Sequence, residues 1–228
     1  MQSAARWLED TFHYDFKTPE LFENARTHRS APGGSYERLE FLGDAILDLV
    51  ISAELYDLRP DATEGDLSRL RAHLVSDVSL AKIATELNLG DHLRLGEGER
   101  KSGGHRRASI LADALEALFA AVYLDSDYAT TRHVILGCFG DRLADLPDAA
   151  ELRDPKTRLQ EWLQGRGRPL PDYTLATVSG EAHQQRIEVT CKLVDGALAS
   201  QGEGTSRRRA EQESARRMLA LLAEHDTA

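Results

Sequence analysis

Cysteine is scarce in this sequence, and long apolar runs are missing. The 228 residues include only two cysteines, Cys138 and Cys191, far apart in the chain. This usage argues against a disulfide framework and predicts a reducing, cytoplasmic environment. The longest apolar stretches stay below the roughly 18 residues that a membrane-spanning helix needs, and the first residues lack the apolar core of a secretory signal. We therefore expect a soluble protein without a membrane partner.

An excess of basic residues is also missing. The net charge of −10 would by itself argue against a nucleic-acid partner. The charge is unevenly distributed, however, because residues 154–228 hold 11 basic and 11 acidic residues, whereas residues 1–153 hold 17 and 27. This asymmetry predicts two units with different roles.

Apolar residues with helical period fill the first part of the chain and predict an all-α domain over residues 1–146. The predicted helices cover 4–12, 19–28, 36–57, 66–73, 77–88, 108–124 and 129–144. Segments that contain glycine or proline separate most of them. A short polar linker over 147–153 is expected to follow.

Residues 154–224 are expected to form a small α+β domain of order α-β-β-β-α. The sequence predicts helices over 155–165 and 206–223, and strands over 173–178, 187–193 and 197–201. The last strand should end before Gly202 and Gly204. Trp162 and Tyr173 are expected in the core, beneath two helices that cover one face of an antiparallel sheet.

Two carboxylates stand inside an otherwise apolar helix. Between Ile110 and Leu124, Tyr123 is the only other ionisable residue beside Asp113 and Glu116. Residues three apart share a helix face, with Cβ atoms about 5–6 Å apart. Burying unpaired carboxylates costs several kcal/mol. A positive group is therefore expected to compensate for them.

A second predicted helix repeats this pattern. Glu37, Glu40 and Asp44 fall within about 60° of one another around the helix axis, and Leu47 and Ile51 continue the same stripe. A solvated acidic face would not continue into an apolar one. Hard cations such as Mg²⁺ prefer oxygen ligands, and carboxylates around Mg²⁺ commonly activate water against a phosphodiester. The pattern favours hydrolysis by metal and carboxylates.

An alternative for these acids stays open, because acidic side chains on helices are usually solvated or paired. The partners would be arginines such as Arg38, Arg69 or Arg71. A structural role is also favoured for Glu64, which follows Thr63 in an acidic variant of a helix-capping box.

The most specific segment is Glu37–Ala45, ERLEFLGDA, which resembles the signature motif of bacterial ribonuclease III. Other segments resemble the family in the same order: 27–30, 64–68, 101–104, 109–117 and, at the start of its double-stranded-RNA-binding domain, 154–161. The resemblance covers nearly the whole chain. It implies a helical endonuclease domain over 1–146 and a double-stranded-RNA-binding domain over 154–224.

The resemblance also implies functional residues. The metal ligands would be Glu40, Asp44, Asp113 and Glu116, with Asp44 and Glu116 as the catalytic pair and Glu37 and Glu64 as accessory acids near the cleavage site. A homodimer would use Mg²⁺, with Mn²⁺ as a possible substitute, to cleave double-stranded RNA with metal-activated water. The products would carry 5′-phosphate and 3′-hydroxyl ends with a short 3′ overhang. Precursors of ribosomal RNA and some messenger RNAs would be the substrates.

The second unit has its own candidate contacts to RNA. The last predicted helix opens with Arg207, Arg208 and Arg209, although cations are unfavourable at the positive end of a helix dipole. A bound phosphate would explain them, because the dipole and the arginines attract the same anion. By itself, His183 is expected to be an ordinary turn residue. The resemblance adds four contacts in the minor groove: Thr157, Gln160, Glu161 and His183. Such domains recognise the A-form duplex over about 16 base pairs, largely without sequence preference.

Two other functions remain as alternatives. A non-catalytic double-stranded-RNA-binding protein would keep the arginines but have little reason to keep four acids in apolar helices. A helical metalloenzyme acting on a small phosphorylated molecule would explain the first unit but not the second. Metal-dependent cleavage of a long RNA duplex would distinguish all three.

Overall fold

The computed structural model describes residues 4–180, 185–196 and 198–226. The chain divides into two compact units, Met1–Ala149 and Ala150–Ala228, and each is described by itself below. The predicted linker, 147–153, spans this division, and its bounds stay a prediction.

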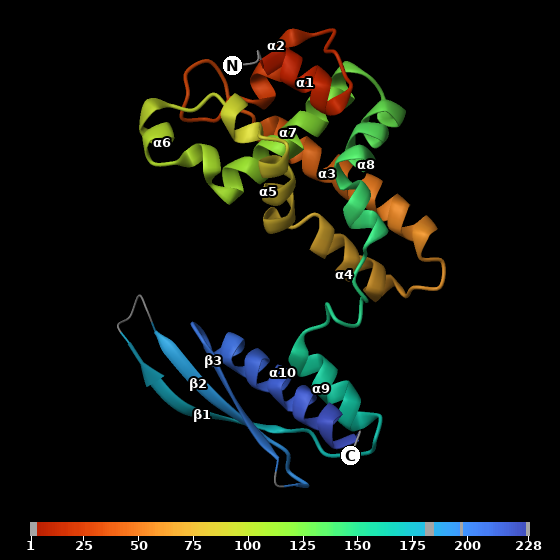
Figure 1. Cartoon of the computed structure of the whole chain (residues 1–228), viewed down its shortest axis with the longest axis vertical. Helices are drawn as coiled ribbons and strands as arrows, with labels where there is room; N and C mark the ends of the chain where they lie inside the picture. The colour runs from red at the N-terminus through yellow and green to blue at the C-terminus, as the bar shows by residue number, and fades with distance from the viewer. Residues whose placement is uncertain (1–3, 181–184, 197, 227–228) are drawn as a thin grey trace. The chain divides into compact units, whose positions relative to one another are not determined.

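The first unit is helical, as the sequence predicts (Figure 1). Its elements are α1 (Ala4–Phe12), α2 (Pro19–Ala25), α3 (Glu37–Leu58), α4 (Glu64–Leu74), α5 (Asp77–Glu86), η1 (Leu89–His92), α6 (Glu97–Lys101), η2 (Gly104–Arg106), α7 (Ala108–Asp125) and α8 (Tyr128–Ala144). Helix α7 forms the centre of this unit and packs against α2, α3, α5 and α8. Such burial explains why nearly all of its sequence is apolar.

Helices α3 and α7 approach one another closely where Gly43 meets Glu116. A Cβ atom added at Gly43 would lie 2.0 Å from the backbone oxygen of Glu116. Since real side chains cannot come this close, glycine is the residue that permits this crossing. The crossing lies where the predicted acidic residues of both helices are found.

Helix α2 is shorter than predicted and ends at Ala25 rather than at residue 28. Thr27 forms a β-bridge with Arg94, and the backbone N–H of His28 donates to the Arg94 carbonyl at 3.0 Å. These contacts between distant segments replace the last helical turn. They hold His28 at the start of the turns that lead to α3.

The second unit has the predicted order α-β-β-β-α (Figure 1). Its elements are α9 (Pro155–Gln164), β1 (Asp172–Ser179), β2 (Arg186–Lys192), β3 (Ala199–Gly204) and α10 (Arg207–Asp226). The strands form an antiparallel sheet of order β1-β2-β3. Helices α9 and α10 lie side by side on one face of that sheet.

The predicted end of the third strand is wrong, because β3 continues through Gly202 and Gly204. A Cβ atom at Gly202 would lie 2.2 Å from the backbone nitrogen of Ser214 on α10. The glycines therefore allow the last helix to pack directly on the strand instead of ending it. Leu159, Met218 and Cys191 are fully buried in the core between helices and sheet.

Trp162 and Tyr173 are partly buried and pack against this core, as the sequence predicts. The thiols of Cys138 and Cys191 are both free. No helix within the described ranges is long and apolar enough to cross a membrane.

Candidate active site

The crossing of α3 and α7 brings four predicted acids into electrostatic contact. Glu40 and Asp44 come from α3, and Asp113 and Glu116 come from α7. The pKa of Glu116 is raised to about 8, first by burial and then by the charges of Asp44, Asp113 and Glu40. Like charges and desolvation both favour the neutral carboxyl. These residues are called the acid cluster below.

The other half-buried members of the acid cluster show the same effect. Burial raises the pKa of Glu40, and the charges of Asp113 and Glu37 add to it. The pKa of Asp113 is raised by burial and by the charge of Asp77, although His28 and Arg29 oppose the shift. The cluster therefore has a strongly negative potential that the surrounding cations only partly offset.

The arginines considered as partners do not neutralise the acid cluster. Arg69 pairs with Asp66 at 2.6 Å, and Arg71 lies 3.8 Å from Asp48. Arg38 is exposed, and the described residues show no ion pair between it and any of the four acids. Within the described ranges, none of the four carboxylates is ion-paired, so the salt-bridge alternative is wrong for them.

The donor set of the acid cluster fits a hard divalent cation. All four side chains offer carboxylate oxygens, the ligands that Mg²⁺ prefers. Over the part of the chain that the structure describes, no three His, Cys, Asp or Glu side chains are arranged to hold a metal ion as they stand. Carboxylates repel one another, so such a cluster is expected to draw together only around a cation.

A polar pocket of about 560 Å³ opens beside the acid cluster, and Glu37, Glu40 and Asp113 line it. The pocket also contains two arginines. Arg29 donates to Glu37 at 3.3 Å, and Arg107 lies 2.8 Å from Glu99. Acidic and basic groups thus line the same pocket, which suits a phosphate bound together with a cation.

The two accessory acids lie in different surroundings. Glu37 lines the polar pocket, whereas Glu64 is exposed in the first turn of α4 and accepts a hydrogen bond from Ser68 at 2.7 Å. Thr63 caps this helix and accepts from the backbone N–H of Asp66, which confirms the N-cap of the predicted capping box. The charge of Glu37 helps to raise the pKa of Glu40, whereas Glu64 is not among the main causes of the raised pKa of Glu40 or Glu116.

Two residues of this site escape the sequence reasoning. Asp77 begins α5 after the N-cap Ser76, where an acid usually only complements the helix dipole. Its charge nevertheless acts on Asp113 and Glu116. Tyr36 precedes α3 and is buried against the pocket. The positions of both residues depend on tertiary packing, and no local pattern indicates them.

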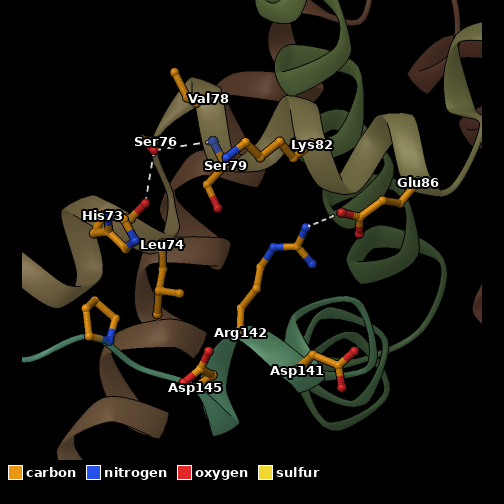
Figure 2. Close-up of a pocket in the computed structure, with 11 residues that line it drawn as sticks. His73, Leu74, Ser76, Val78, Ser79, Lys82, Glu86, Asp141, Arg142 and Asp145 are labelled. Carbon is orange, nitrogen blue, oxygen red and sulfur yellow. Dashed lines mark hydrogen bonds and ion pairs between the residues drawn. The ribbon is translucent and has the colours of Figure 1, made fainter.

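A larger pocket of about 730 Å³ lies among α4, α5 and α8 (Figure 2). It shares no lining residue with the polar pocket. Arg142 extends across it and donates to Glu86 at 2.8 Å. Among the described residues, the carboxylate of Glu86 is thus ion-paired, unlike the four carboxylates of the acid cluster.

Six of the seven predicted RNA contacts of the second unit lie on α9 and at the start of α10. Thr157 is exposed, Gln160 is half-buried, and Glu161 pairs with Arg153 at 2.7 Å. His183 lies outside the described residues.

The three arginines that are predicted to contact RNA occupy the first turn of α10, which contains no acidic residue. Arg207 pairs with Glu211 at 2.9 Å, and Arg209 donates to the hydroxyl of Thr205 at 3.3 Å. Arg208 is exposed, and no ion pair joins it to another described residue. It is therefore the member of this group that is most available to a phosphate.

Comparison with family models divides the chain in the same way as its packing. Residues 18–141 match the ribonuclease-III-like family, and residues 155–222 match the double-stranded RNA binding motif. Both matches agree with the resemblance noted in the sequence.

Curated relatives match over most of the chain. A protein named ribonuclease 3 from Alkalilimnicola ehrlichii is 57% identical over 94% of this chain and 94% of its own length. The ribonuclease 3 of Vibrio cholerae is 53% identical over 94% of this chain and 96% of its own length.

Solved structures match the first unit. The nuclease domain of ribonuclease III from Campylobacter jejuni has a TM-score of 0.60 and 39% identity, and covers 64% of this chain and all of that domain. A second structure of that domain, with a TM-score of 0.59 and 41% identity, covers 61% of this chain and 98% of its own, and is described as flexible in a region involved in dimer formation.

Proposed function

This chain belongs to the ribonuclease III family, and we propose that it is a Mg²⁺-dependent endonuclease that cleaves double-stranded RNA. The observation that carries the proposal is the acid cluster at the α3–α7 crossing. Glu40, Asp113 and Glu116 are partly buried without ion pairs, and the pKa of Glu116 is raised to about 8. An uncompensated site of this kind is expected to bind a cation.

The residues of the acid cluster would have distinct roles. Glu40, Asp44, Asp113 and Glu116 would hold the metal, with Asp44 and Glu116 as the pair most directly involved in catalysis. Bound Mg²⁺ lowers the pKa of water and stabilises a departing oxygen. Glu116 must release its proton before its carboxylate can act as a ligand, because its pKa is raised to about 8. Glu37 and Glu64 would assist near the cleavage site.

The second unit would hold the duplex while the first cuts it. Arg207, Arg208 and Arg209 would contact phosphates, and Thr157, Gln160, Glu161 and His183 would contact the minor groove. Products with 5′-phosphate and 3′-hydroxyl ends and a short 3′ overhang would follow. A non-catalytic RNA-binding protein is disfavoured, because it would gain nothing from unpaired carboxylates that destabilise the fold.

A homodimer is supported by an exposed apolar stripe on α3. Phe41, Leu49 and Tyr56 are 81%, 57% and 70% exposed. Their spacing places them along one side of the helix. Apolar side chains gathered in this way commonly mark an interface between proteins. We therefore propose that α3 pairs with a second copy of the chain, and that each subunit cuts one RNA strand.

The free cysteines bear on the cellular setting of the protein. Cys138 and Cys191 are both free, which suits a reducing cytoplasm. The maturation of ribosomal RNA precursors and of some messenger RNAs would be the role of such an enzyme.

Cleavage of a long RNA duplex by the full-length protein, with and without Mg²⁺, tests the enzyme proposal. The wild type should cut only with metal, and Glu116→Gln should bind the duplex without cutting it. Glu86→Gln is the matched control, because Glu86 is already neutralised by Arg142. Binding without cleavage by the wild type would refute the enzyme proposal. Equal cleavage by wild type and Glu116→Gln would refute the assignment of the site.

A further inference from the structure

Tyr36 has a buried hydroxyl that lacks a hydrogen-bond partner. The residue is only 2% exposed, and no described residue donates to or accepts from its Oη atom. Buried polar groups are nearly always paired, and an exception calls for an explanation such as a missing ion or a functional role. The unpaired hydroxyl of Tyr36 is such an exception.

Hydrogen bonds hold the backbone of Tyr36 in place, and its side chain is buried. Its N–H donates to the carbonyl of Thr27 at 2.9 Å. Its carbonyl accepts from the N–H groups of Leu39 and Glu40 at 2.8 and 2.9 Å, which begin α3. The ring lies 5.7 Å from the ring of His28, measured between centroids. Tyr36 is thus a buried residue in the wall of the polar pocket.

Several hydrogen-bond acceptors share the polar pocket with Tyr36. Glu37, Glu40 and Asp113 line the same pocket as Tyr36. Burial raises the pKa of Tyr36, and the charge of Asp113 contributes more than that of Glu40. The phenol thus keeps its proton and can donate a hydrogen bond to a neighbouring carboxylate.

We propose that Tyr36 is a positioning residue, which donates a hydrogen bond to Asp113 and fixes this carboxylate for the metal. The proposal rests on the metal site of the proposed function. Carboxylates that bind metals are themselves held by hydrogen bonds from surrounding residues, and loss of such a partner commonly weakens metal binding by about 10–100-fold. The unpaired hydroxyl would find its partner when the cluster draws together around a cation.

Titration of the full-length protein with Mn²⁺, without RNA, tests this proposal. Free Mn²⁺ can be followed by electron paramagnetic resonance. Tyr36→Phe removes only the hydroxyl and should weaken Mn²⁺ binding about tenfold. Without metal, the variant should melt at the same temperature as the wild type or higher, since it no longer buries an unpaired polar group. In cleavage assays, saturating Mg²⁺ should restore most of its rate.

Tyr14→Phe is the matched control in the same unit. The Tyr14 hydroxyl donates to Asp125 at 2.7 Å, so this variant should melt lower than the wild type and bind Mn²⁺ unchanged. The proposal is overturned if Tyr36→Phe binds Mn²⁺ as tightly as the wild type, or if it melts lower without metal, as Tyr14→Phe should. If the wild type itself binds no Mn²⁺, the proposed metal site fails, and the role of Tyr36 fails with it.

Discussion

The carboxyl group of Glu116 is half-buried on α7 and is influenced by several other acids. Its raised pKa of about 8 has a consequence for stability. Between about pH 4.5 and pH 8, the folded protein keeps a proton that the unfolded chain has released. The free energy of unfolding of the metal-free protein should therefore fall as pH rises through this window.

Replacing Glu116 with glutamine should remove most of this pH dependence. At about pH 8.5 without metal, Glu116→Gln should be more stable than the wild type by about 1–2 kcal/mol, a value reduced from that of a fully buried group by solvent screening. At about pH 5 the two proteins should be similar. Urea unfolding at both pH values measures this difference. Parallel pH profiles for both proteins would contradict the prediction, and Glu86→Gln should follow the wild type.

At the scale of the helices, the crossing of α3 and α7 determines where the acids meet. Gly43→Ala would place a Cβ atom 2.0 Å from the Glu116 carbonyl oxygen, so the helices must separate. We expect a loss of about 1–3 kcal/mol in stability and reduced cleavage, because Asp44 and Glu116 move apart. Chemical denaturation and the cleavage rate of the same preparation measure both effects.

Gly137→Ala on α8 is the control for this substitution. An added Cβ atom there would meet no described atom within 4 Å. Alanine favours the helix over glycine by about 0.5–1 kcal/mol, so this variant should be slightly more stable and equally active. If Gly43→Ala behaved in the same way, the close crossing would not be needed for the site.

The start of α10 should contribute to RNA binding mainly through charge. Arg208→Ala should weaken duplex binding for all sequences alike and reduce the slope of log K against log salt by about one. Arg216 of the same helix pairs with Glu213 at 2.8 Å, and Arg216→Ala should leave the slope unchanged. Titrations at several salt concentrations measure the slope. An unchanged slope for Arg208→Ala would show that this arginine does not contact phosphate.

At the scale of the whole molecule, the exposed stripe on α3 predicts self-association. Phe41→Asp places a charge at the most exposed apolar residue of the stripe. It should weaken dimerisation at least about tenfold, because desolvating an unpaired charge in an interface is costly. Sedimentation analysis measures the association constant. Val194→Asp, which changes an exposed residue of the second unit, should have no effect, and a dimeric Phe41→Asp would refute this interface.

Much of both units follows from the sequence alone. Helical period predicts α1, α3, α7 and α8 to within one or two residues, since long amphipathic or buried helices carry strong local patterns. The order α-β-β-β-α and the family follow as well. The sequence also indicates the four acids of the cluster, because carboxylates in an apolar helix are costly without a partner.

Contacts between distant segments decided the rest. Thr27 leaves α2 to pair with Arg94, β3 continues through Gly202 because α10 packs on it, and Asp77 comes to act on Glu116. Each outcome depends on which surfaces meet after folding, and no local pattern carries that information. The sequence by itself determined which groups are available for chemistry. Tertiary packing decided which of them share one electrostatic environment, because desolvation and charge repulsion act through space rather than along the chain.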